Sequence, residues 1–372
     1  MSVNATVLSA GRVLDVLRKG WQAQAAGGLT ASWMIHGRPG VGKSQVVRQL
    51  AEEIGATLFD LRLTTIEPQD LRGLPYYDHE ARKTVWYRPE DLPDDPSQPS
   101  ILFLDELTAA SPYLQPTVYG LLQERRVGQH HLPDNVMIVA AGNTVEDGAI
   151  AYEMGTALSD RLIHLIMQAD PRDWTENYAS IKGLAPAVSA FLRTRPDLLE
   201  TTEDSLRRGH LIACTPRAWE RVSDILTAID DRSARNAMVS GTLGEAVASE
   251  FLLVADEIAA YVQIEDLLKA TEAERAALFP ASLHGLNAIV FGLVGAASSG
   301  QWPAVIDTME LIRRLPKHRP EPAFATLPLS ELCALGFEML MTKAFKINAQ
   351  DVFVQSESYA RYAADRAALG LD

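Results

Sequence analysis

The stretch Ile35 to Ser44 reads IHGRPGVGKS and contains the pattern G-x-x-x-x-G-K-S. Glycines in such a pattern let successive backbone N–H groups turn inward around phosphate oxygens. Lys43 is expected to reach the outer phosphates, and the Ser44 hydroxyl to ligate Mg²⁺. The candidate phosphate-binding loop therefore consists of Gly37, Arg38, Pro39, Gly40, Val41, Gly42, Lys43 and Ser44.

The flanking sequence supports this interpretation. Residues 32–36 (SWMIH) form a short apolar run typical of a buried strand. After the loop, apolar residues recur at helical spacing at Val46, Val47, Leu50 and Ile54. A helix that begins at the phosphates directs the positive end of its dipole toward them. A strand before the loop and a helix after it favour a phosphate site over a chance glycine-rich turn.

The composition describes an ordinary globular chain. It has 372 residues, long enough for two or three domains, with 47% hydrophobic and 22% charged residues. Two cysteines, Cys214 and Cys333, exclude a disulfide framework and are expected to be buried structural thiols. No secretory signal is visible, and the longest apolar stretch, 286–297, is too short for a membrane helix. We expect a cytoplasmic protein.

The formal net charge of −14 contains no basic block. Proteins that grip nucleic acid usually present a lysine and arginine face, because phosphate contacts dominate their affinity. The charge therefore makes a nucleic-acid partner unlikely, although an acidic chain can still hide a basic pore.

A second acidic site follows at Ile101 to Glu106 (ILFLDE). Its four apolar residues predict a strand buried on both faces, with the carboxylates at the end where open α/β sheets place ligands. Asp105 would organise Mg²⁺, and Glu106 would orient and deprotonate the attacking water. Combined with the loop, this pattern predicts hydrolysis of the nucleotide.

Three more polar residues occur at positions suited to phosphate chemistry. Asn143 follows the predicted strand 136–140 and could contact the γ-phosphate or the water, although it could also be a turn residue. Arg161 precedes the predicted strand 162–166, and we expect it to point toward a neighbouring subunit's nucleotide, although it could also form a surface pair with Asp160. Arg217 follows Pro216 in the first turn of a predicted helix and could fold back onto the phosphates.

The ordered set GRPGVGKS, ILFLDE, AAGN, ALSDR and TPRAW resembles an AAA+ ATPase over roughly residues 5 to 230. More narrowly it resembles the MoxR family, in the branch with the magnesium-chelatase ATPase subunits. The resemblance implies an α/β P-loop core, with a parallel five-stranded sheet and inserted β-hairpins. An α-helical lid and an additional α-helical C-terminal region would follow. It also implies roles for Asn143 as sensor 1, Arg217 as sensor 2 and Arg161 as a trans-acting finger.

Two segments carry the narrower resemblance. Residues 70–75 (DLRGLP) resemble a family element that precedes an inserted hairpin, which here would use Tyr76, Tyr77 and residues 84–87. The aromatic residues could grip polypeptide or simply pack the hairpin. Residues 122–134 resemble the helix end and hairpin before sensor 1, and Arg125 and Arg126 there are rival candidates for the finger.

We expect three domains: the nucleotide-binding core at 1–168, the helical lid at 169–232 and a helical region of unknown role at 233–372. The resemblance implies an ATP- and Mg²⁺-dependent homo-oligomeric ring, a hexamer, that remodels or activates a protein client. The partner is often a separate chain with a von Willebrand factor A domain. A nucleic-acid motor and a nucleotide-gated assembly scaffold are the alternatives.

Overall fold

The computed structural model describes residues 3–143 and 155–368. The chain divides into two compact units, an α/β unit and a helical unit. The α/β unit comprises residues 1–169 with 202–207, and the helical unit comprises 170–201 with 208–372. The boundaries expected at residues 168 and 232 stay predictions, and each unit is described by itself.

The α/β unit contains a parallel six-stranded sheet in the order β1-β10-β2-β9-β6-β3. The strands are Val7–Leu8 (β1), Ser32–His36 (β2), Thr57–Arg62 (β3), Ser100–Asp105 (β6), Val136–Gly142 (β9) and Leu162–Met167 (β10). The sequence predicted five strands. The sixth, β1, adds an edge beside β10, and its two residues are too few to show a periodic pattern.

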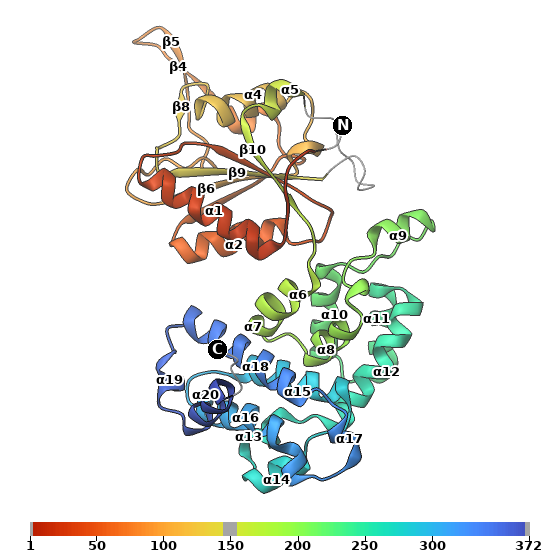
Figure 1. The fold of residues 1–372 in the computed structure, drawn as a ribbon. Helices are drawn as coiled ribbons and strands as arrows, with labels where there is room; N and C mark the ends of the chain where they lie inside the picture. Colours follow the sequence, from red (N-terminus) through yellow and green to blue (C-terminus); the bar gives the residue numbers. More distant parts are fainter. Residues whose placement is uncertain (1–2, 144–154, 369–372) are drawn as a thin grey trace. The chain divides into compact units, whose positions relative to one another are not determined.

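Helices cover both faces of this sheet (Figure 1). The helices α1 (Ala10–Ala25) and α2 (Lys43–Ile54) pack on one face, over a core that includes Ile35 and Phe103. The other face is covered by α4 (Gln115–Tyr119) and α5 (Thr156–Ser159), over Met34 and Leu104. Because residues on both faces of β2, β6 and β9 are buried, these strands read as continuous apolar runs in the sequence.

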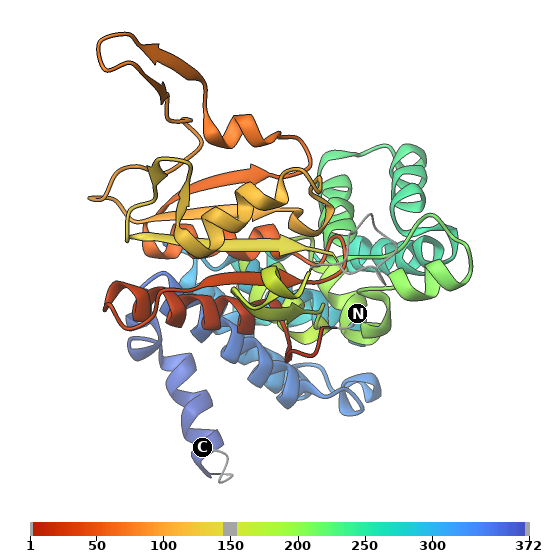
Figure 2. The same cartoon turned by 90° about the horizontal axis from the view of Figure 1, so that it is seen from above.

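Two hairpins leave the sheet, as the sequence predicted. The first pairs β4 (Pro75–Asp78) with β5 (Lys83–Trp86), follows α3 (Pro68–Arg72), and protrudes from the core in both ribbon views (Figures 1 and 2). The second pairs β7 (Arg126–Val127) with β8 (His130–His131), after the π-helical turn Gly120–Glu124.

The helical unit contains a large apolar core, to which residues 262–362 contribute. Its helices and helical turns are Pro171–Asp173 (α6), Trp174–Ala179 (η4), Ser180–Lys182 (α7), Pro186–Thr194 (α8), Pro196–Leu198 (η5), Pro216–Ala228 (α10), Arg232–Leu243 (α11), Glu245–Tyr261 (α12), Ile264–Lys269 (α13), Glu272–Ala277 (α14), Leu283–Ala296 (α15), Trp302–His318 (α16), Pro322–Ala325 (α17), Leu329–Lys346 (α18), Asp351–Val354 (α19) and Glu357–Ala368 (α20). The turn of helix Thr202–Arg207 (α9) groups with the α/β unit.

Helices from both sides of residue 232 share side-chain contacts. Phe191 of α8, Trp219 of α10 and Phe251 of α12 form an aromatic cluster with ring centroids 5.3–5.6 Å apart. Residues 286–296 of the longest apolar stretch lie in the buried helix α15. Within residues 3–143 and 155–368, no helix is long and apolar enough to cross a membrane.

Candidate active site

The glycines of the phosphate-binding loop are required by its backbone. The loop connects the end of β2 at His36 to the start of α2 at Lys43. Gly40 and Gly42 adopt left-handed conformations, with φ of 80° and 106°. A Cβ at Gly37 would lie 2.5 Å from the backbone oxygen of Met167. Any other residue at these positions would strain or block the loop.

Lys43 and Asn143 meet at the carboxyl edge of the sheet. The Lys43 ammonium donates to Asn143 Oδ1 at 2.8 Å and to the carbonyl oxygens of Gly37 and Arg38, at 2.5 and 3.0 Å. Asn143 directly follows β9, which lies between β2 and β6. The strand order therefore places an ammonium and an amide together where phosphate oxygens would accept their hydrogen bonds.

Ser44 and Asp105, the two predicted Mg²⁺ ligands, are also neighbours. The Ser44 hydroxyl donates to Asp105 Oδ2 at 3.1 Å, and Asp105 is 8% exposed. Hydroxyl and carboxylate oxygens are the hard ligands that Mg²⁺ prefers, and one or two of them suffice because this ion keeps several waters and substrate phosphates. The donor set at this position therefore fits Mg²⁺ bound together with a nucleotide.

Glu106 stands beside this pair in an unusual backbone conformation. Its φ is 60°, which is rare for a residue with a side chain and is often found at functional sites. The Thr64 hydroxyl donates to Glu106 Oε2 at 2.5 Å, and Arg62 Nε lies 3.9 Å from Glu106 Oε1. Arg62 also lies 3.9 Å from Asp105 Oδ2.

Arg62 and Thr64 were not predicted from the sequence. Arg62 ends β3 and pairs in register with Asp105 of β6, so it is the sheet pairing that brings both residues to the acidic pair. The residues of β3 (TLFDLR) do not identify the strand that pairs with it. No motif could have identified these two residues.

Arg161 lies at the amino ends of the parallel strands, whereas the loop lies at their carboxyl ends. It precedes β10, whose Leu162 pairs with Ser32 at the start of β2, whereas the loop follows the end of β2. Five strand residues span roughly 16 Å. Arg161 Nε donates to Gln123 Oε1 at 2.5 Å. The fold therefore separates Arg161 from Lys43 of its own chain.

The rival arginines contact groups of their own chain. Arg125 donates to the carbonyl oxygens of Pro133 and Val136, at 2.9 and 2.5 Å, and burial lowers the pKa of its guanidinium. Arg126 forms an ion pair with Glu124 at 2.6 Å. Arg125 thus fastens the second hairpin to the start of β9, a structural role that the sequence left open.

The remaining predicted residues have local roles. Arg38 of the loop forms an ion pair with Glu203 at 2.9 Å, and Val41 is buried. Arg217 occupies the first turn of α10, as predicted, after the N-cap Thr215. Because α10 belongs to the helical unit, the contact of Arg217 with phosphates stays a prediction.

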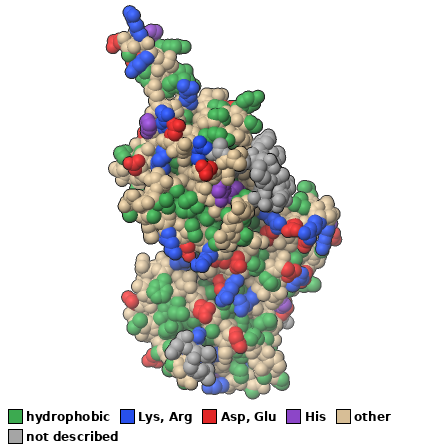
Figure 3. Space-filling model, turned by 45° about the horizontal axis from the view of Figure 1, so that its top comes forward, with side chains coloured by type: hydrophobic (Ala, Val, Ile, Leu, Met, Phe, Trp, Pro, Cys, Tyr) green, Lys and Arg blue, Asp and Glu red, His purple; other side chains and the backbone are tan. Residues whose placement is uncertain are grey.

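The β4–β5 hairpin exposes aromatic side chains. Tyr77 is 72% exposed and Tyr87 is 63% exposed, while Tyr76 stacks on Tyr87 with centroids 4.6 Å apart. Arg72 lies over the Trp86 ring at 4.2 Å. Figure 3 shows hydrophobic and basic side chains along this protrusion. Some of its rings pack the hairpin, and others face outward.

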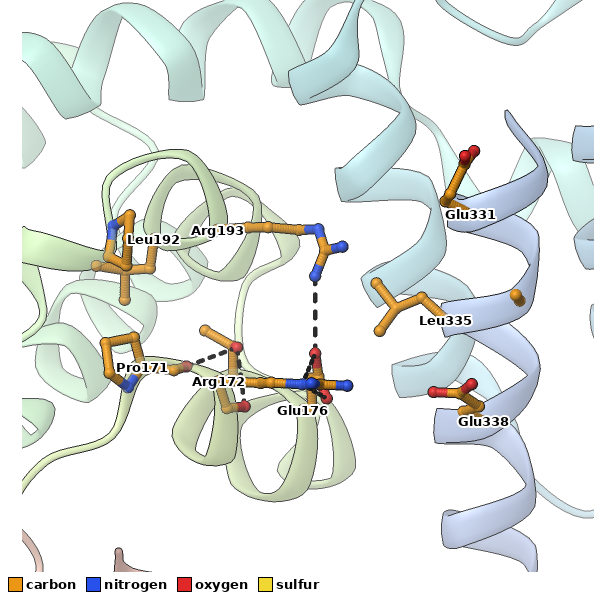
Figure 4. Close-up of a pocket in the computed structure, with 11 residues that line it drawn as sticks. Pro171, Arg172, Glu176, Leu192, Arg193, Glu331, Leu335 and Glu338 are labelled. Carbon is orange, nitrogen blue, oxygen red and sulfur yellow. Dashed lines mark hydrogen bonds and ion pairs between the residues drawn. The ribbon is translucent and has the colours of Figure 1, made fainter. Parts of the chain in front are cut away.

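A separate hollow of about 500 Å³ lies in the helical unit (Figure 4). Arg172 donates to Glu176 at 3.1 Å, and Arg193 lies 3.7 Å from the same carboxylate. Glu331 and Glu338 of α18 line the opposite wall. The hollow contains none of the residues predicted for phosphate chemistry.

Comparisons with known proteins agree with this geometry. Residues 32–162 match the AAA domain (dynein-related subfamily) family. The ATPase family gene 2 protein homolog B of Mus musculus is 34% identical over 115 residues, which are 31% of this chain and 13% of that protein. The uncharacterized protein YeaC of Bacillus subtilis (strain 168) is 30% identical over 139 residues, which are 36% of this chain and 41% of that protein.

The chain thus spans less than half the length of these curated relatives. Among solved structures, a mutant of RuvB from Thermotoga maritima is 15% identical, with a TM-score of 0.38. That match covers 76% of this chain and 81% of RuvB. This likeness is too slight to carry an argument about function.

Proposed function

We propose that this chain binds ATP with Mg²⁺ and hydrolyses it to ADP and phosphate, and the match of residues 32–162 to the AAA domain (dynein-related subfamily) family supports this. One observation carries the proposal. Three adjacent strands, β2, β9 and β6, end at this site. Lys43 and Ser44 begin α2 after β2 and contact Asn143 after β9 and Asp105 at the end of β6, with Glu106 next to Asp105.

Each side chain has a role that its position supports. The loop N–H groups and the Lys43 ammonium would bind the phosphates, and Asn143 would contact the γ-phosphate or the attacking water. Glu106 would take a proton from that water, with Thr64 fixing one of its carboxylate oxygens. Mg²⁺ held near Ser44 and Asp105 would neutralise charge on the phosphate oxygens.

We further propose that the complete site forms between subunits of a homo-oligomeric ring, a hexamer. Arg161 lies at the amino ends of the strands, away from the loop of its own chain. This supports the proposal, because the arginine could then reach phosphates only in a neighbouring subunit. Such a finger in trans stabilises charge on the transferred phosphoryl group, worth about 10³- to 10⁵-fold in rate. Arg217 would complete the same site from α10.

The proposed task is remodelling or activation of a protein client. The outward tyrosines of the β4–β5 hairpin support a contact with polypeptide, since exposed aromatic side chains are favoured in protein interfaces. A client with a von Willebrand factor A domain rests on the family resemblance alone. The charge of −14 disfavours a nucleic-acid motor, and the presence of both Glu106 and Asn143 disfavours a switch that never hydrolyses.

The first experiment is to measure ATP turnover per subunit across a wide range of protein concentration. If specific activity rises and then plateaus, sites form between subunits. If it is flat but substantial, sedimentation at the lowest concentration decides whether the ring persists or a single chain is sufficient. Turnover by a monomer would overturn the trans site. Stimulation by DNA that weakens steeply with salt would instead favour the nucleic-acid motor.

A further inference from the structure

Two histidines lie in contact inside the α/β unit, outside the phosphate site. His36 ends β2, one residue before Gly37, and is 4% exposed. His164 is in β10, the neighbouring strand. His36 Nε2 and His164 Nδ1 are 2.8 Å apart, and the two rings stack with an interplanar angle of 17°.

The strand register explains this contact. His164 pairs with Met34, and Ile166 pairs with His36, so the two histidines are diagonal neighbours on one face of the sheet. Met34 and Leu162 on the same face are buried and apolar. A buried imidazole is costly unless it is hydrogen-bonded, so His36 requires a specific partner, and the partly buried His164 supplies one.

His164 also contacts Ser159, in the turn just before Arg161. Its Nε2 lies 2.9 Å from the carbonyl oxygen of Ser159 and 3.0 Å from the Ser159 hydroxyl. A carbonyl oxygen can only accept, so His164 Nε2 carries the proton and donates it. In the neutral ring Nδ1 is then the acceptor, and His36 Nε2 donates to it.

Two hydrogen bonds therefore connect His36, at the end of β2 where the phosphate-binding loop begins, through His164 to Ser159. Arg161 stands two residues after Ser159, at the opposite edge of the sheet. Ser159 ends the short helix α5, and a helix of four residues has little stability of its own. Its placement must come from contacts such as the one with His164.

We propose that His164, oriented by His36, is a positioning residue for Arg161. The inference rests on the proposed trans role of Arg161 and adds to it the side chains that hold the arginine's turn. Since a misplacement of about 1 Å can cost 10²-fold in rate, loss of the Ser159 contact is expected to slow the neighbouring subunit's turnover on the order of 10- to 100-fold.

The test uses mixed rings of two full-length variants. The acceptor subunit carries Arg161→Ala, with an intact nucleotide site and no finger. The donor subunit carries Glu106→Gln, with its arginine but no base for its own site. ATP turnover in the mixture, above that of either variant alone, then comes from acceptor sites completed by donor arginines.

A matched pair of substitutions is then placed in the donor only. His164→Gln keeps an amide N–H that reaches Ser159. His164→Asn keeps a polar group next to His36 but is too short to reach Ser159. Both replacement side chains are polar and smaller than histidine. Their comparison therefore tests whether the side chain reaches Ser159, rather than how well it packs. His131→Asn, an exposed histidine of β8, is the control.

We expect the Gln and His131→Asn donors to restore turnover nearly as well as the parent donor. The Asn donor should restore 10- to 100-fold less, while its ATP affinity and assembly stay unchanged. Equal restoration by the Asn and parent donors would overturn the role of His164 alone. Equal losses with Asn and Gln would indicate packing instead and overturn it too. If the parent donor restores nothing, the trans role of Arg161 is wrong, and the inference falls with it.

Discussion

At the scale of single residues, the site depends on groups that hold one another in place. Lys43 donates to two carbonyl oxygens of the loop and to Asn143. Ser44 donates to Asp105, and Thr64 donates to Glu106. Each group named for phosphate chemistry thus has a fixed neighbour, which limits the reorganisation needed when substrate binds.

Lys43→Ala is expected to lower ATP affinity by about 100-fold or more. The variant loses charge-assisted hydrogen bonds to phosphate, which are worth about 1.5–3 kcal/mol each. Titration of the folded protein with a fluorescent ATP analogue measures the change. Lys269→Ala is the control, because that side chain is 74% exposed. Unchanged affinity in Lys43→Ala would show that the loop does not bind the phosphates.

Glu106→Gln is expected to bind ATP and assemble normally while turnover falls by about 10²- to 10⁴-fold. The amide keeps an oxygen that can accept from Thr64, but it cannot take a proton from water. Phosphate release under saturating ATP is the measurement, with Glu124→Gln as the control at a half-exposed carboxylate. Normal turnover in Glu106→Gln would contradict its assignment as the base.

At the scale of elements, the first hairpin depends on a glycine at its base. Gly73 has φ of 83°, and a Cβ there would lie 1.8 Å from the Tyr87 backbone oxygen. The chain on either side of the hairpin therefore passes closer than any side chain would allow. The glycine in the sequence DLRG (residues 70–73) is thus explained by the close approach of the chain before β4 to the chain after β5.

Gly73→Ala is expected to destabilise the α/β unit by about 1–3 kcal/mol, since the new methyl group forces the backbone apart. Thermal unfolding followed by calorimetry measures the loss. Gly241→Ala provides the contrast, because its Cβ would meet nothing within 4 Å and its φ is ordinary. A Gly73→Ala variant as stable as the parent protein would mean that the hairpin base can shift freely.

Tyr77→Ala is expected to leave basal ATP turnover and stability unchanged, because the ring is 72% exposed. Stimulation of turnover by an unfolded polypeptide such as casein should fall several-fold, as an exposed aromatic anchor is lost. Tyr113→Ala is the matched control, since Tyr113 is 83% exposed on the same unit. Equal stimulation of both variants would count against a client contact at the hairpin.

At the scale of the whole molecule, helices of the helical unit are held by an apolar core and by an ionic network around one buried carboxylate. Glu310 of α16 is fully buried and pairs with Arg313 and Arg314, at 2.9 and 2.7 Å. Arg313 also pairs with Asp365 of α20, and Arg314 with Glu272 of α14. This network ties helices far apart in the sequence to one carboxylate.

Both cysteines lie inside this unit and are buried, as the sequence predicted. Burial raises the pKa of Cys214 to about 11 and that of Cys333 to about 12. Because these folded values exceed the ordinary thiol value of 9.0, the associated stability is complete below pH 9 and declines as the pH rises above it.

We therefore expect neither thiol to react with a disulfide reagent at pH 8 in the folded protein. Both should react in guanidinium, because the thiolate is the reactive form and unfolding restores its ordinary pKa. Absorbance of the released thiolate gives the count of modified cysteines. Rapid modification of either thiol at pH 8 without denaturant would show that the helical unit opens locally.

The sequence by itself determined the elements whose chemistry is local. The loop from Gly37 to Ser44 needs particular backbone angles and hydrogen-bond donors, and only certain residues supply them. The buried strands β2 and β6 show their burial as apolar runs at 33–35 and 101–104. Asp105, Glu106 and Asn143 could be placed at strand ends because parallel strands all finish at one edge of the sheet.

Tertiary structure alone decided which of these residues meet. Strand pairing brought Arg62 and Thr64 to Glu106, and the second hairpin and the start of β9 supplied the carbonyl oxygens that hold Arg125. Strand register placed His36 beside His164. The backbone preference and burial of a residue can be predicted from its near neighbours along the chain. Pairing between strands depends instead on contacts between residues far apart in the chain, 128 residues for His36 and His164, and no local pattern records them.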